Sequence, residues 1–366
     1  MKLAKSKLGD YLLPVRNISL GNLPTDIDIT YVDISSVDRE QRAIIRHQII
    51  PINEAPSRAR QEIAKYDVIV STVRPNLNTV ALVTDEYANA IASTGFCVLR
   101  AMPEELDAGF LFHWISSEAT VNRLMGLATG ATYPAVSDKI IKSLPFVAPP
   151  ILEQQCIATI LDKASSLRRK RQEAIRLASE LVCSKFLEMF GEPHTNVKGL
   201  PKTSLGDLVR LKSGNFLPSH EMAGTGGVFV YGGNGVNGEH DTAMFDDVKL
   251  VIGRVGAYCG AVHLTKPHSW ITDNALYVSE ISPLIRLEYL AFALTQANLN
   301  QYSSQSGQPL VSASRLYPVM LVLPPLSLQD AFLEVLERTT RIQASQTNSL
   351  EALEEMSHSL AAELFA

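Results

Sequence analysis

Two short stretches decide how this chain folds, APPILEQQ at residues 148–155 and LPPLSLQD at residues 323–330. Each has a pair of prolines with a glutamine four positions after the second proline, and the copies lie 175 residues apart. Proline is favoured just before or at the first turn of a helix, and neither following stretch contains a helix breaker before Gly191 or the last residue. The pattern therefore predicts two long helices, over residues 151–191 and 326–366.

The repetition extends well beyond the proline pairs. LGD occurs near the start of each half, and three further segments recur in the same order, which is typical of a duplicated unit. The matched pairs are DVIVSTVRPNLNTVALVT from Asp67 with DVKLVIGRVGAYCGAVHLT from Asp247, STGFCVL from Ser93 with TDNALYV from Thr272, and GATYPAVS from Gly130 with GQPLVSAS from Gly307. This alignment places Arg74 opposite Arg254. The chain is thus predicted to contain two copies of one domain, each followed by a long helix.

Each copy combines strand-like and helical stretches. Short runs rich in Val, Ile, Thr and aromatic residues, such as residues 68–73 and 250–252, lie between Gly, Asn and Pro, as strands joined by loops do. Apolar residues have helical spacing at residues 109–125 and 284–299, at equivalent places in the two halves. The expected fold class is α+β, with two similar mixed α/β domains.

The two long helices share a seven-residue pattern in the same phase. In the second helix, one set of positions is Phe332, Thr339, Gln346, Leu353 and Leu360, and the set three residues later is Val335, Ile342, Ser349, Met356 and Glu363. The corresponding sets in the first helix are Ile157, Ala164, Arg171, Ala178 and Lys185, and Ile160, Leu167, Ala174, Leu181 and Glu188. Such spacing is typical of a coiled-coil seam, although its polar members make this seam imperfect. A second interpretation remains open, in which each amphipathic helix packs on its own domain.

Charge favours pairing of the two helices with each other. The first helix carries RRKR at residues 168–171, whereas the second carries Glu351, Glu354 and Glu355, so pairing would neutralise both runs. Because the first helix leads to the second domain, from which the second helix starts, the second helix must run back along the first. The expected architecture has domains at residues 1–150 and 192–325 joined by an antiparallel coiled coil, with pseudo-two-fold symmetry.

Composition excludes several classes of protein. A chain of 366 residues exceeds what one core usually organises. The net charge of -5 comes mostly from residues 326–366, with 2 basic and 7 acidic groups, whereas residues 1–150 carry 15 and 16 and residues 196–325 carry 9 and 9. Each domain is near neutral, which allows a local basic face but no strong nonspecific attraction for nucleic acid.

No apolar run approaches the roughly 18 residues of a membrane helix, and no secretion signal is recognisable, so we expect a cytoplasmic location and no membrane partner.

Sequence motifs for catalysis and metal binding are absent. There is no G-x-x-x-x-G-K-[ST], no G-x-S-x-G and no H-E-x-x-H, and the proline pairs lack the neighbours of a base-holding methyltransferase loop. The isolated Cys97, Cys156, Cys183 and Cys259 predict four buried thiols rather than a metal or disulfide framework. The glycine-rich YGGNGVNGEHD at residues 231–241 lacks a following Lys and helix, and predicts a tight turn rather than a phosphate cradle.

Over essentially its whole length the chain resembles the specificity subunit of type I restriction–modification systems. The resemblance is carried by the duplicated units and by GATYPAVS, GQPLVSASRL, STVRP, IGRVG, YGGNGVNGEHD and YVDISSVD, the last at residues 31–38. It implies two target-recognition domains that each read one half of a bipartite site on double-stranded DNA. It also implies that the helices dock two methyltransferase (modification) subunits and set the spacing, and that translocating nuclease (restriction) subunits join for restriction. The chain itself would hold no cofactor, since S-adenosylmethionine and the catalytic residues belong to the methyltransferase.

Base discrimination would come from Arg, Asn, Gln and Ser side chains that reach base edges. In the first domain, the candidate DNA-binding residues are Arg74, Asn76, Asn78, Thr132, Tyr133, Ser137 and Lys139. In the second domain, they are Asn234, Asn237, His240, Arg254, Tyr258, Gln308, Ser312 and Arg315. Structural roles remain open for five of them: capping for Ser137 and Ser312, pairing inside the domain for Arg74 and Arg254, and packing for Tyr133.

Two functions of other classes also remain open. One is a coiled-coil scaffold whose duplicated domains bind proteins or glycans, and the other is an enzyme with an unfamiliar site. For a DNA reader, the divergence between the two domains predicts two different half-sites, unlike the palindrome that an exactly symmetric dimer would read.

Overall fold

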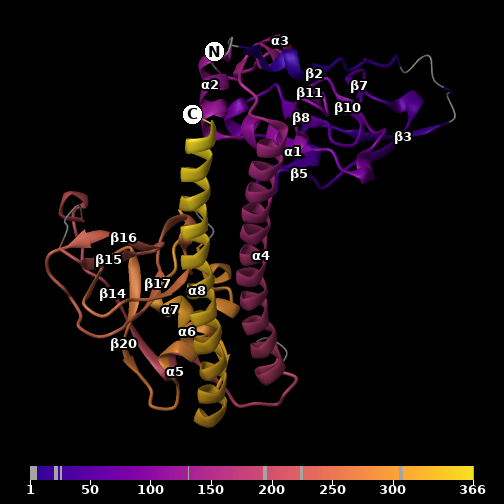
Figure 1. Cartoon of the computed structure of the whole chain (residues 1–366). Helices are drawn as coiled ribbons and strands as arrows, with labels where there is room; N and C mark the ends of the chain where they lie inside the picture. The colour runs from indigo at the N-terminus through magenta and orange to yellow at the C-terminus, as the bar shows by residue number, and fades with distance from the viewer. Residues whose placement is uncertain are drawn as a thin grey trace. The chain divides into compact units, whose positions relative to one another are not determined.

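The structure, a computed structural model, describes residues 6–19, 24, 27–130, 132–192, 196–222, 226–304 and 308–365. Contacts within the chain divide it into two compact units. Unit 1 comprises Met1–Glu173 and Gln346–Ala366, and unit 2 comprises Ala174–Ser345. Each unit contains two larger sheets, several short helices and part of each of two long helices (Figure 1).

The two long helices predicted from the proline pairs are confirmed. Helix α4 spans Ile151–Phe190 and helix α8 spans Leu326–Phe365. Helix α4 ends where Gly191 adopts a left-handed conformation with φ 74°, and the Gly191 N–H donates to the carbonyl oxygen of Leu187 at 2.8 Å. Among the helices that the structure describes, none has an apolar stretch of the length that crossing a bilayer requires.

Unit 1 is built on two four-stranded sheets. The first has antiparallel neighbours in the order β2-β11-β8-β9, with bounds Leu12–Leu13, Phe96–Ala101, Val68–Ser71 and Val80–Leu82. The second has the order β6-β3-β10-β7, with bounds Gln48–Pro51, Asp28–Val32, Ile91–Ser93 and Ala59–Glu62. Its central pair, β3 and β10, is parallel, so the sheet is mixed.

Alternation of side chains along β8 gives unit 1 its layers. Val68 and Val70 face an apolar core shared with the helices, whereas Ile69 between them faces a core shared with the second sheet. Because successive side chains of a strand point to opposite faces, one sheet separates two apolar clusters. The layers of unit 1 are therefore helices, first sheet and second sheet.

Unit 2 has the same layers. Its first sheet has antiparallel neighbours in the order β14-β20-β17-β18, with bounds Val209–Ser213, Ala275–Ile281, Leu250–Gly253 and Val262–Leu264. Its second sheet has the order β16-β15-β19, with bounds Gly235–His240, Val228–Gly232 and Ser269–Ile271, and β15 is parallel to β19. Strand β8 thus corresponds to β17 and β11 to β20, and the predicted duplication of an α+β fold is confirmed.

Short elements complete both units. The short helices are α1 (Ala108–Ile115), α2 (Glu118–Leu127), α3 (Asp138–Lys142), α5 (Leu205–Leu208), α6 (Leu287–Gln296) and α7 (Ala313–Leu316). Two-stranded sheets join β1 (Ser6–Lys7) to β12 (Pro145–Phe146), β4 (Val37–Asp38) to β5 (Ala43–Ile44), and β13 (Lys202–Ser204) to β21 (Met320–Val322). The helical stretch predicted at residues 109–125 is divided into α1 and α2, because the Ser117 hydroxyl caps a new helix by accepting from the N–H of Thr120.

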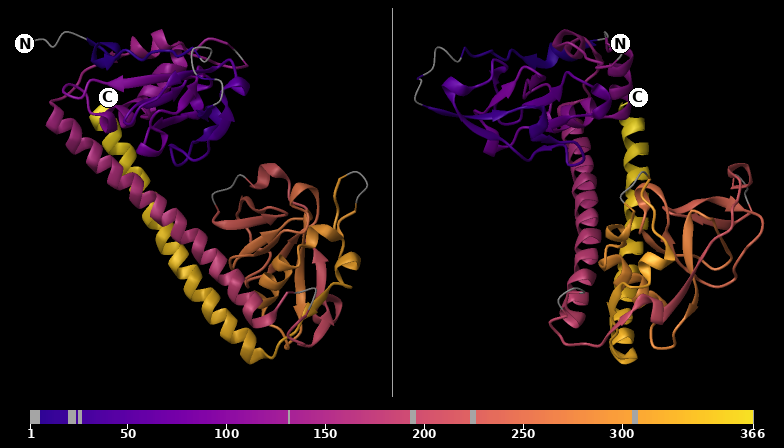
Figure 2. Two further views of the ribbon diagram at one scale, coloured as in Figure 1. Left: turned by 90° about the vertical axis from the view of Figure 1, so that its right-hand side faces the viewer. Right: turned by 180° about the vertical axis from the view of Figure 1, so that it is seen from behind.

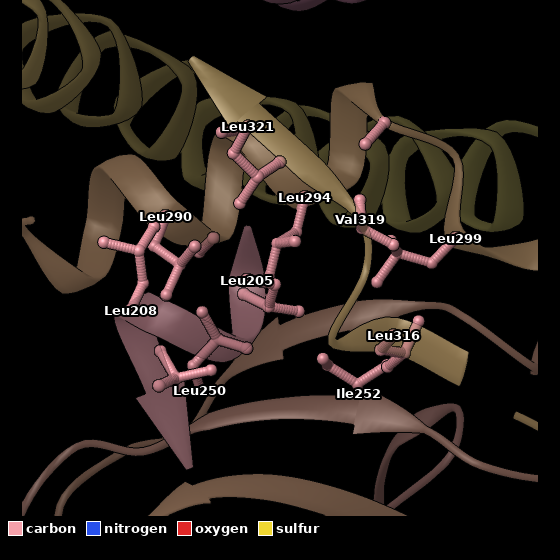
Figure 3. Packing of buried hydrophobic residues seen from close by; sticks show 14 of the residues in the cluster. Leu205, Leu208, Leu250, Ile252, Leu290, Leu294, Leu299, Leu316, Val319 and Leu321 are labelled. Atoms are coloured by element: carbon pink, nitrogen blue, oxygen red, sulfur yellow. The ribbon is translucent and has the colours of Figure 1, made fainter. Parts of the chain in front are cut away.

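The main core of unit 2 joins its first sheet to its helices. Figure 3 shows aliphatic side chains from β17, α5, α6 and α7 converging in this core, among them Leu250, Leu208 and Leu294. Phe186 of α4 and Phe332 of α8 belong to the same cluster, with ring centroids 5.4 Å apart. The long helices are therefore part of the hydrophobic core rather than external additions.

A buried glutamine fixes the start of each long helix. In unit 1, the Gln154 amide donates to the carbonyl oxygens of Pro149 (2.7 Å) and Glu105 (2.9 Å) and accepts from the N–H of Asp107 (2.9 Å). In unit 2, the Gln329 amide makes the same three bonds, to Pro324 (2.8 Å), Leu284 (3.0 Å) and Arg286 (2.8 Å). Both glutamines are 0% exposed. Each glutamine joins the proline pair and the start of α1 or α6 to the first turn of the long helix. This shared role explains why the motif at residues 148–155 recurs at residues 323–330.

Within each unit, the two long helices run in opposite directions (Figure 2). In unit 1, the start of α4 meets the end of α8, where Ile157 and Leu161 share a cluster with Leu364 and Phe365. In unit 2, the end of α4 meets the start of α8, where Val182 and Phe186 share a cluster with Phe332 and Leu336. The predicted antiparallel pairing is confirmed in each unit.

The predicted seam is only half right. Its first set of positions faces inward, as Phe332, Thr339 and Ile157 show, all being buried. Most of its second set faces outward, because the exposed fractions are 47% at Ile160 and Leu167, 56% at Leu181, 55% at Ile342 and 59% at Met356. Neighbours such as Leu161 and Val182 pack in their place. The sheets and short helices cover one side of each long helix, and this rotates the contact stripe away from the two-helix seam.

The predicted charge pairing between the helices is wrong in its detail. In the described part of the chain, no ion pair within 4.0 Å joins residues 168–171 to Glu351, Glu354 or Glu355. Arg171 donates instead to the amide oxygen of Gln346 at 3.1 Å, and Arg168 donates to a backbone carbonyl at 2.6 Å. In unit 1 the hydrogen bond between Arg171 and Gln346, rather than these opposite charges, accompanies the apolar packing of the two helices.

Replacing the buried glutamine should destabilise the unit that contains it. Gln154→Ala leaves one backbone N–H and two carbonyl oxygens buried without partners, so we expect the free energy of unfolding to fall by about 3 kcal/mol. Chemical denaturation of the whole chain, followed by circular dichroism, measures the loss. Gln155→Ala, at the exposed neighbouring position, is the control and should change the free energy by less than about 0.5 kcal/mol. Equal effects of the two substitutions would contradict the anchoring role.

Candidate nucleic-acid interface

The loop after β8, residues 72–79, carries three of the candidate residues of unit 1. Arg74 adopts φ 50°, Pro75–Leu77 form a single helical turn, and Asn78 adopts φ 46°. Left-handed backbone conformations are uncommon for residues other than glycine. Arg74 and Asn78 both adopt one, and the single turn Pro75–Leu77 lies between them. This β8 loop is therefore compact, and it begins at the end of a fully buried strand.

A second loop, the late loop at residues 132–137, lies against the β8 loop. The N–H of Arg74 donates to the carbonyl oxygen of Pro134 at 2.7 Å, and the N–H of Val136 donates to that of Thr72 at 2.8 Å. The Arg74 guanidinium lies 4.6 Å from the centroid of the Tyr133 ring, in cation–π geometry. Tyr133 is 64% exposed and Arg74 is also exposed. Two candidates from distant parts of the sequence thus form one stacked pair at the surface.

The other candidates on these loops divide into outward-facing and inward-facing residues. Asn76 and Thr132 are exposed and adjoin the stacked pair along the chain. Asn78 faces inward, since its amide nitrogen donates to the carbonyl oxygen of Ser116 at 2.8 Å. We therefore assign Asn78 to holding the β8 loop on the turn between α1 and α2, and not to contacting a ligand.

Ser137 and Lys139 lie just beyond the late loop. The Ser137 hydroxyl accepts from the N–H of Ile140 at 3.3 Å and caps α3, which is the structural alternative considered for it from the sequence. Lys139 is exposed on this short helix. Of the two, the lysine is the one available to a partner.

The equivalent of Arg74 in unit 2 is Gly256, and the alignment of Arg74 with Arg254 is wrong by two residues. The N–H of Gly256 donates to the carbonyl oxygen of Pro309 at 3.1 Å, as that of Arg74 does to Pro134. The N–H of Val311 donates to Arg254 at 2.9 Å, so Arg254 corresponds to Thr72. Residue similarity favoured matching the two arginines, whereas strand register and these backbone bonds determine which positions are equivalent.

This correspondence gives the two units different side chains at one place in the fold. Pro134 corresponds to Pro309, so Tyr133 corresponds to Gln308. Unit 1 has the stacked Arg74 and Tyr133, whereas unit 2 has Gly256 (φ 78°) with the exposed Gln308, whose amide nitrogen lies 3.6 Å from where a Cβ on the glycine would be. A planar cationic pair in one unit is thus replaced by a single neutral amide in the other.

Arg254 and Tyr258 flank Gly256 in unit 2. Arg254 is half-buried, and its guanidinium donates to the Ser213 hydroxyl at 3.2 Å and to the carbonyl oxygen of Asp273 at 3.5 Å. It is therefore held within its own unit, as the structural alternative proposed. Tyr258 is 54% exposed, on the single turn Gly256–Tyr258.

Arg315 belongs to the short helix α7, and Ser312 directly precedes this helix. The Ser312 hydroxyl is hydrogen-bonded to that of Ser314 at 2.9 Å and makes no capping bond to the backbone. Arg315 is exposed, and its guanidinium reaches the carbonyl oxygen of Tyr302 at 3.4 Å. Unlike Ser137, Ser312 does not cap the helix that follows it. Its side chain is half-buried.

The glycine-rich stretch at residues 231–241 contains the turn of a β-hairpin, so the predicted tight turn is confirmed. Asn234 lies in the two-residue turn between β15 and β16, and Asn237 packs over Gly232, where a Cβ would lie 2.1 Å from its amide nitrogen. His240 is at the opposite end of the hairpin, bonded to the carbonyl oxygen of Glu221 at 3.1 Å and 5.3 Å from the Trp270 ring. The structure therefore brings Asn234 and Asn237 together but not His240.

The cysteines differ from expectation in their burial. Cys97 and Cys259 are buried, but Cys183 is half-buried and Cys156 is exposed, so four buried thiols are not observed. Burial, followed by the charge of Asp138, raises the pKa of the Cys97 thiol. Among the described residues, no three His, Cys, Asp or Glu side chains gather in a group that could hold a metal ion.

Comparison with known proteins gives the family. The family model described as "Type I restriction modification DNA specificity domain" matches residues 28–177 and 199–355 of this chain. The specificity subunit of the type I restriction enzyme EcoprrI from Escherichia coli is 26% identical over 324 residues, which is 84% of this chain and 80% of that protein. The specificity subunit of the type I restriction enzyme HindI from Haemophilus influenzae is 23% identical over 187 residues, 47% of this chain and 41% of that protein.

Solved structures share the fold. The S subunit of a type I restriction–modification system from M. genitalium has a TM-score of 0.69 at 16% identity, covering 99% of this chain and 96% of that one. A chain from a structure of complex assembly and conformational transition in the type I system has a TM-score of 0.62 at 23% identity, with 99% and 97% covered.

The chain therefore belongs to the family of type I restriction–modification DNA specificity domains, which it matches over most of its length. It is a DNA-recognition subunit, and catalysis is not its role, in agreement with relatives named as specificity subunits. Neither a protein- or glycan-binding scaffold nor an enzyme with an unfamiliar site finds support in these comparisons.

Substitutions at Asn78 separate its side chain from its backbone conformation. Asn78→Gly removes the hydrogen bond to Ser116 but accepts φ 46°, so we expect a loss of about 1 kcal/mol in the free energy of unfolding. Asn78→Ala should cost about 1 kcal/mol more, because alanine is strained in the left-handed region. Denaturant unfolding of the two variants measures the difference. If alanine proved as stable as glycine, the left-handed conformation would not constrain this loop.

Proposed function

We propose that the chain reads an asymmetric bipartite DNA site, with a target-recognition domain at residues 1–150 reading one half and another at residues 192–325 reading the other. Spacer helices at residues 151–191 and 326–366 would set the distance between the half-sites. The observation that carries the asymmetry is the replacement of Arg74 and Tyr133 by Gly256 and Gln308 on the same backbone framework. Domains with the same loops would read the same bases, whereas these would not.

The first half-site is contacted by the β8 loop and the late loop. An arginine stacked on a tyrosine has its guanidinium plane oriented for bidentate bonding to guanine in the major groove. Asn76, Thr132 and Lys139 are the remaining exposed candidates around this pair. Asn78 and Ser137 do not contact the bases, because the side chains of both bond to the backbone of their own unit.

The second half-site is contacted by Gln308 and Tyr258, together with Ser312 and Arg315. Glutamine bonds adenine in a bidentate manner, so the replacement of an arginine pair by Gln308 favours a different base at the corresponding position. Asn234 and Asn237 extend this surface through the hairpin turn, while Arg254 and His240 position the loops from within.

Methyltransferase subunits dock on the long helices. Apolar side chains at Ile160, Leu167, Leu181, Ile342 and Met356 remain 47–59% exposed on the outer side of α4 and α8, which is typical of a surface that a protein partner covers. Two such subunits bind S-adenosylmethionine and transfer the methyl group, and translocating nuclease subunits join the complex for restriction. The complex acts on DNA in the cytoplasm.

The reading role is tested by methylation in the assembled complex. The chain is co-produced with its methyltransferase, and methylated genomic DNA is sequenced. We expect Arg74→Lys, which keeps the charge but loses the planar guanidinium, to reduce discrimination at one position of one half-site by about 1–3 kcal/mol, or roughly 5- to 150-fold. Gln308→Ala should relax the other half-site only. Arg58→Ala removes an exposed arginine outside both loops and should leave the recognised sequence unchanged.

The duplicated fold makes a second test available. A fragment of residues 1–191 contains one recognition domain and one spacer helix, and its helix should pair with a second copy in antiparallel orientation. With the methyltransferase, this dimer should direct methylation to a site with two identical half-sites. Size-exclusion chromatography and sequencing of methylated DNA measure both properties. A fragment that stays monomeric and shows no DNA preference would contradict the proposal.

A further inference from the structure

A turn in unit 1 holds an arginine in an unusual position. Arg42 lies between β4 and β5 with φ 50°, and its half-buried side chain donates to the Ser116 hydroxyl at 3.2 Å. The left-handed conformation is unfavourable for arginine. The backbone therefore turns the side chain towards the end of α1 at some cost in free energy.

A second arginine, from α4, approaches the same turn. The Arg168 guanidinium donates to the carbonyl oxygen of Glu40 at 2.6 Å, and Arg168 is also half-buried. Burial, followed by the positive charge of Arg168, lowers the pKa of the Arg42 guanidinium. Two like charges thus lie near each other in unit 1, both partly removed from water.

The two arginines have no acidic partner in the described part of the chain, where no carboxylate lies within 4.0 Å of either guanidinium. Glu40 contributes its carbonyl oxygen to this contact and not its carboxylate. Arg100, which is also half-buried, has an acidic partner, Asp67, at 2.7 Å, whereas the half-buried Arg171 and Arg254 donate to neutral oxygens. Two partly desolvated cations without a counter-charge favour an anion between them, since attraction strengthens as water is excluded.

The fold itself does not require the second arginine. The repeat spacing of 175 residues places Gln343 of α8 at the position of Arg168. Gln343 donates to the Ser179 hydroxyl at 2.8 Å and to the carbonyl oxygen of Ile175 at 3.3 Å, and unit 2 folds with this neutral side chain. The positive charge at Arg168 is therefore present in unit 1 and absent from the equivalent position of unit 2.

Ser116 connects the arginine pair to the β8 loop. Its hydroxyl accepts from Arg42, and its carbonyl oxygen accepts from the amide of Asn78, which ends the loop that carries Arg74. A ligand held by Arg42 would thus be linked by two hydrogen bonds to the loop that we assign to base reading. This connection favours the DNA backbone over an acidic side chain of a protein partner as the source of the anion.

We propose that Arg42 and Arg168 form a phosphate-binding site that holds the DNA backbone next to the first recognition loop. The inference rests on the proposed function and adds to it the phosphate contact that a near-neutral domain needs for affinity. Phosphate contacts fix register and orientation without reading sequence, whereas Arg74 and Tyr133 discriminate bases. The Ser116 connection makes the phosphate contact a positioning device for the β8 loop.

The test measures DNA affinity of the complete complex with its methyltransferase at several salt concentrations. Arg168→Gln introduces the side chain that unit 2 tolerates, and Arg42→Gln removes the second charge. We expect each variant to bind target and unrelated DNA about tenfold more weakly, with the logarithmic salt slope reduced by about one for a single lost phosphate contact. The methylated sequence should not change. Lys65→Gln is the matched control, because it removes a charge already paired with Asp85 at 2.7 Å.

Three results separate the possible failures. Unchanged affinity and salt slope in both arginine variants would overturn the phosphate site while leaving the reading function intact. Weaker assembly with the methyltransferase, with normal DNA binding by the assembled complex, would assign the arginines to a protein contact and also overturn it. A wild-type complex that methylates no DNA would instead refute the proposed function. Thermal unfolding of each variant, compared with wild type, verifies that the effects on affinity come from folded protein.

Discussion

The fold depends on a buried glutamine amide that joins three backbone groups at the start of each long helix. Gln154 and Gln329 are fully buried, and each satisfies two carbonyl oxygens and one N–H that the proline pair and the start of α1 or α6 leave open. An amide side chain has both the donors and the acceptor for this task, and an apolar residue would leave the three groups buried and unpaired. The anchored helices can then contribute side chains to the core of each unit, so their packing follows from this contact.

The common framework allows the surface loops to differ without loss of the fold. The backbone bonds between the loop after the buried strand and the late loop are the same in both units, but Arg74 and Tyr133 in one correspond to Gly256 and Gln308 in the other. Because main-chain bonds join the two loops in both units, their exposed side chains are free to change. This separation of framework and surface is how one duplicated domain can recognise two different targets.

The charged side chains of unit 1 show the same separation between a common framework and a few particular surface residues. The unit is close to neutral overall, so affinity for a polyanion must come from a few placed cations rather than from its net charge. Arg42 and Arg168 are such cations, brought together by a left-handed turn and a helix. Arg74 is the third, and its tyrosine partner orients it without neutralising it. Position rather than number of charges is thus the property that sets this surface apart.

The sequence by itself determined the two long helices, the duplicated α+β domains and the opposite directions of the helices, because proline positions, periodicity and connectivity are local or order-dependent signals. It also identified Arg74, Tyr133 and Gln308 as surface candidates. Only the tertiary structure decided that Gly256 is the counterpart of Arg74, that the outer seam positions such as Ile160 are exposed, and that Arg42 meets Arg168. Strand register and the approach of residues far apart in the chain are set by packing of whole layers, which no single stretch of sequence encodes.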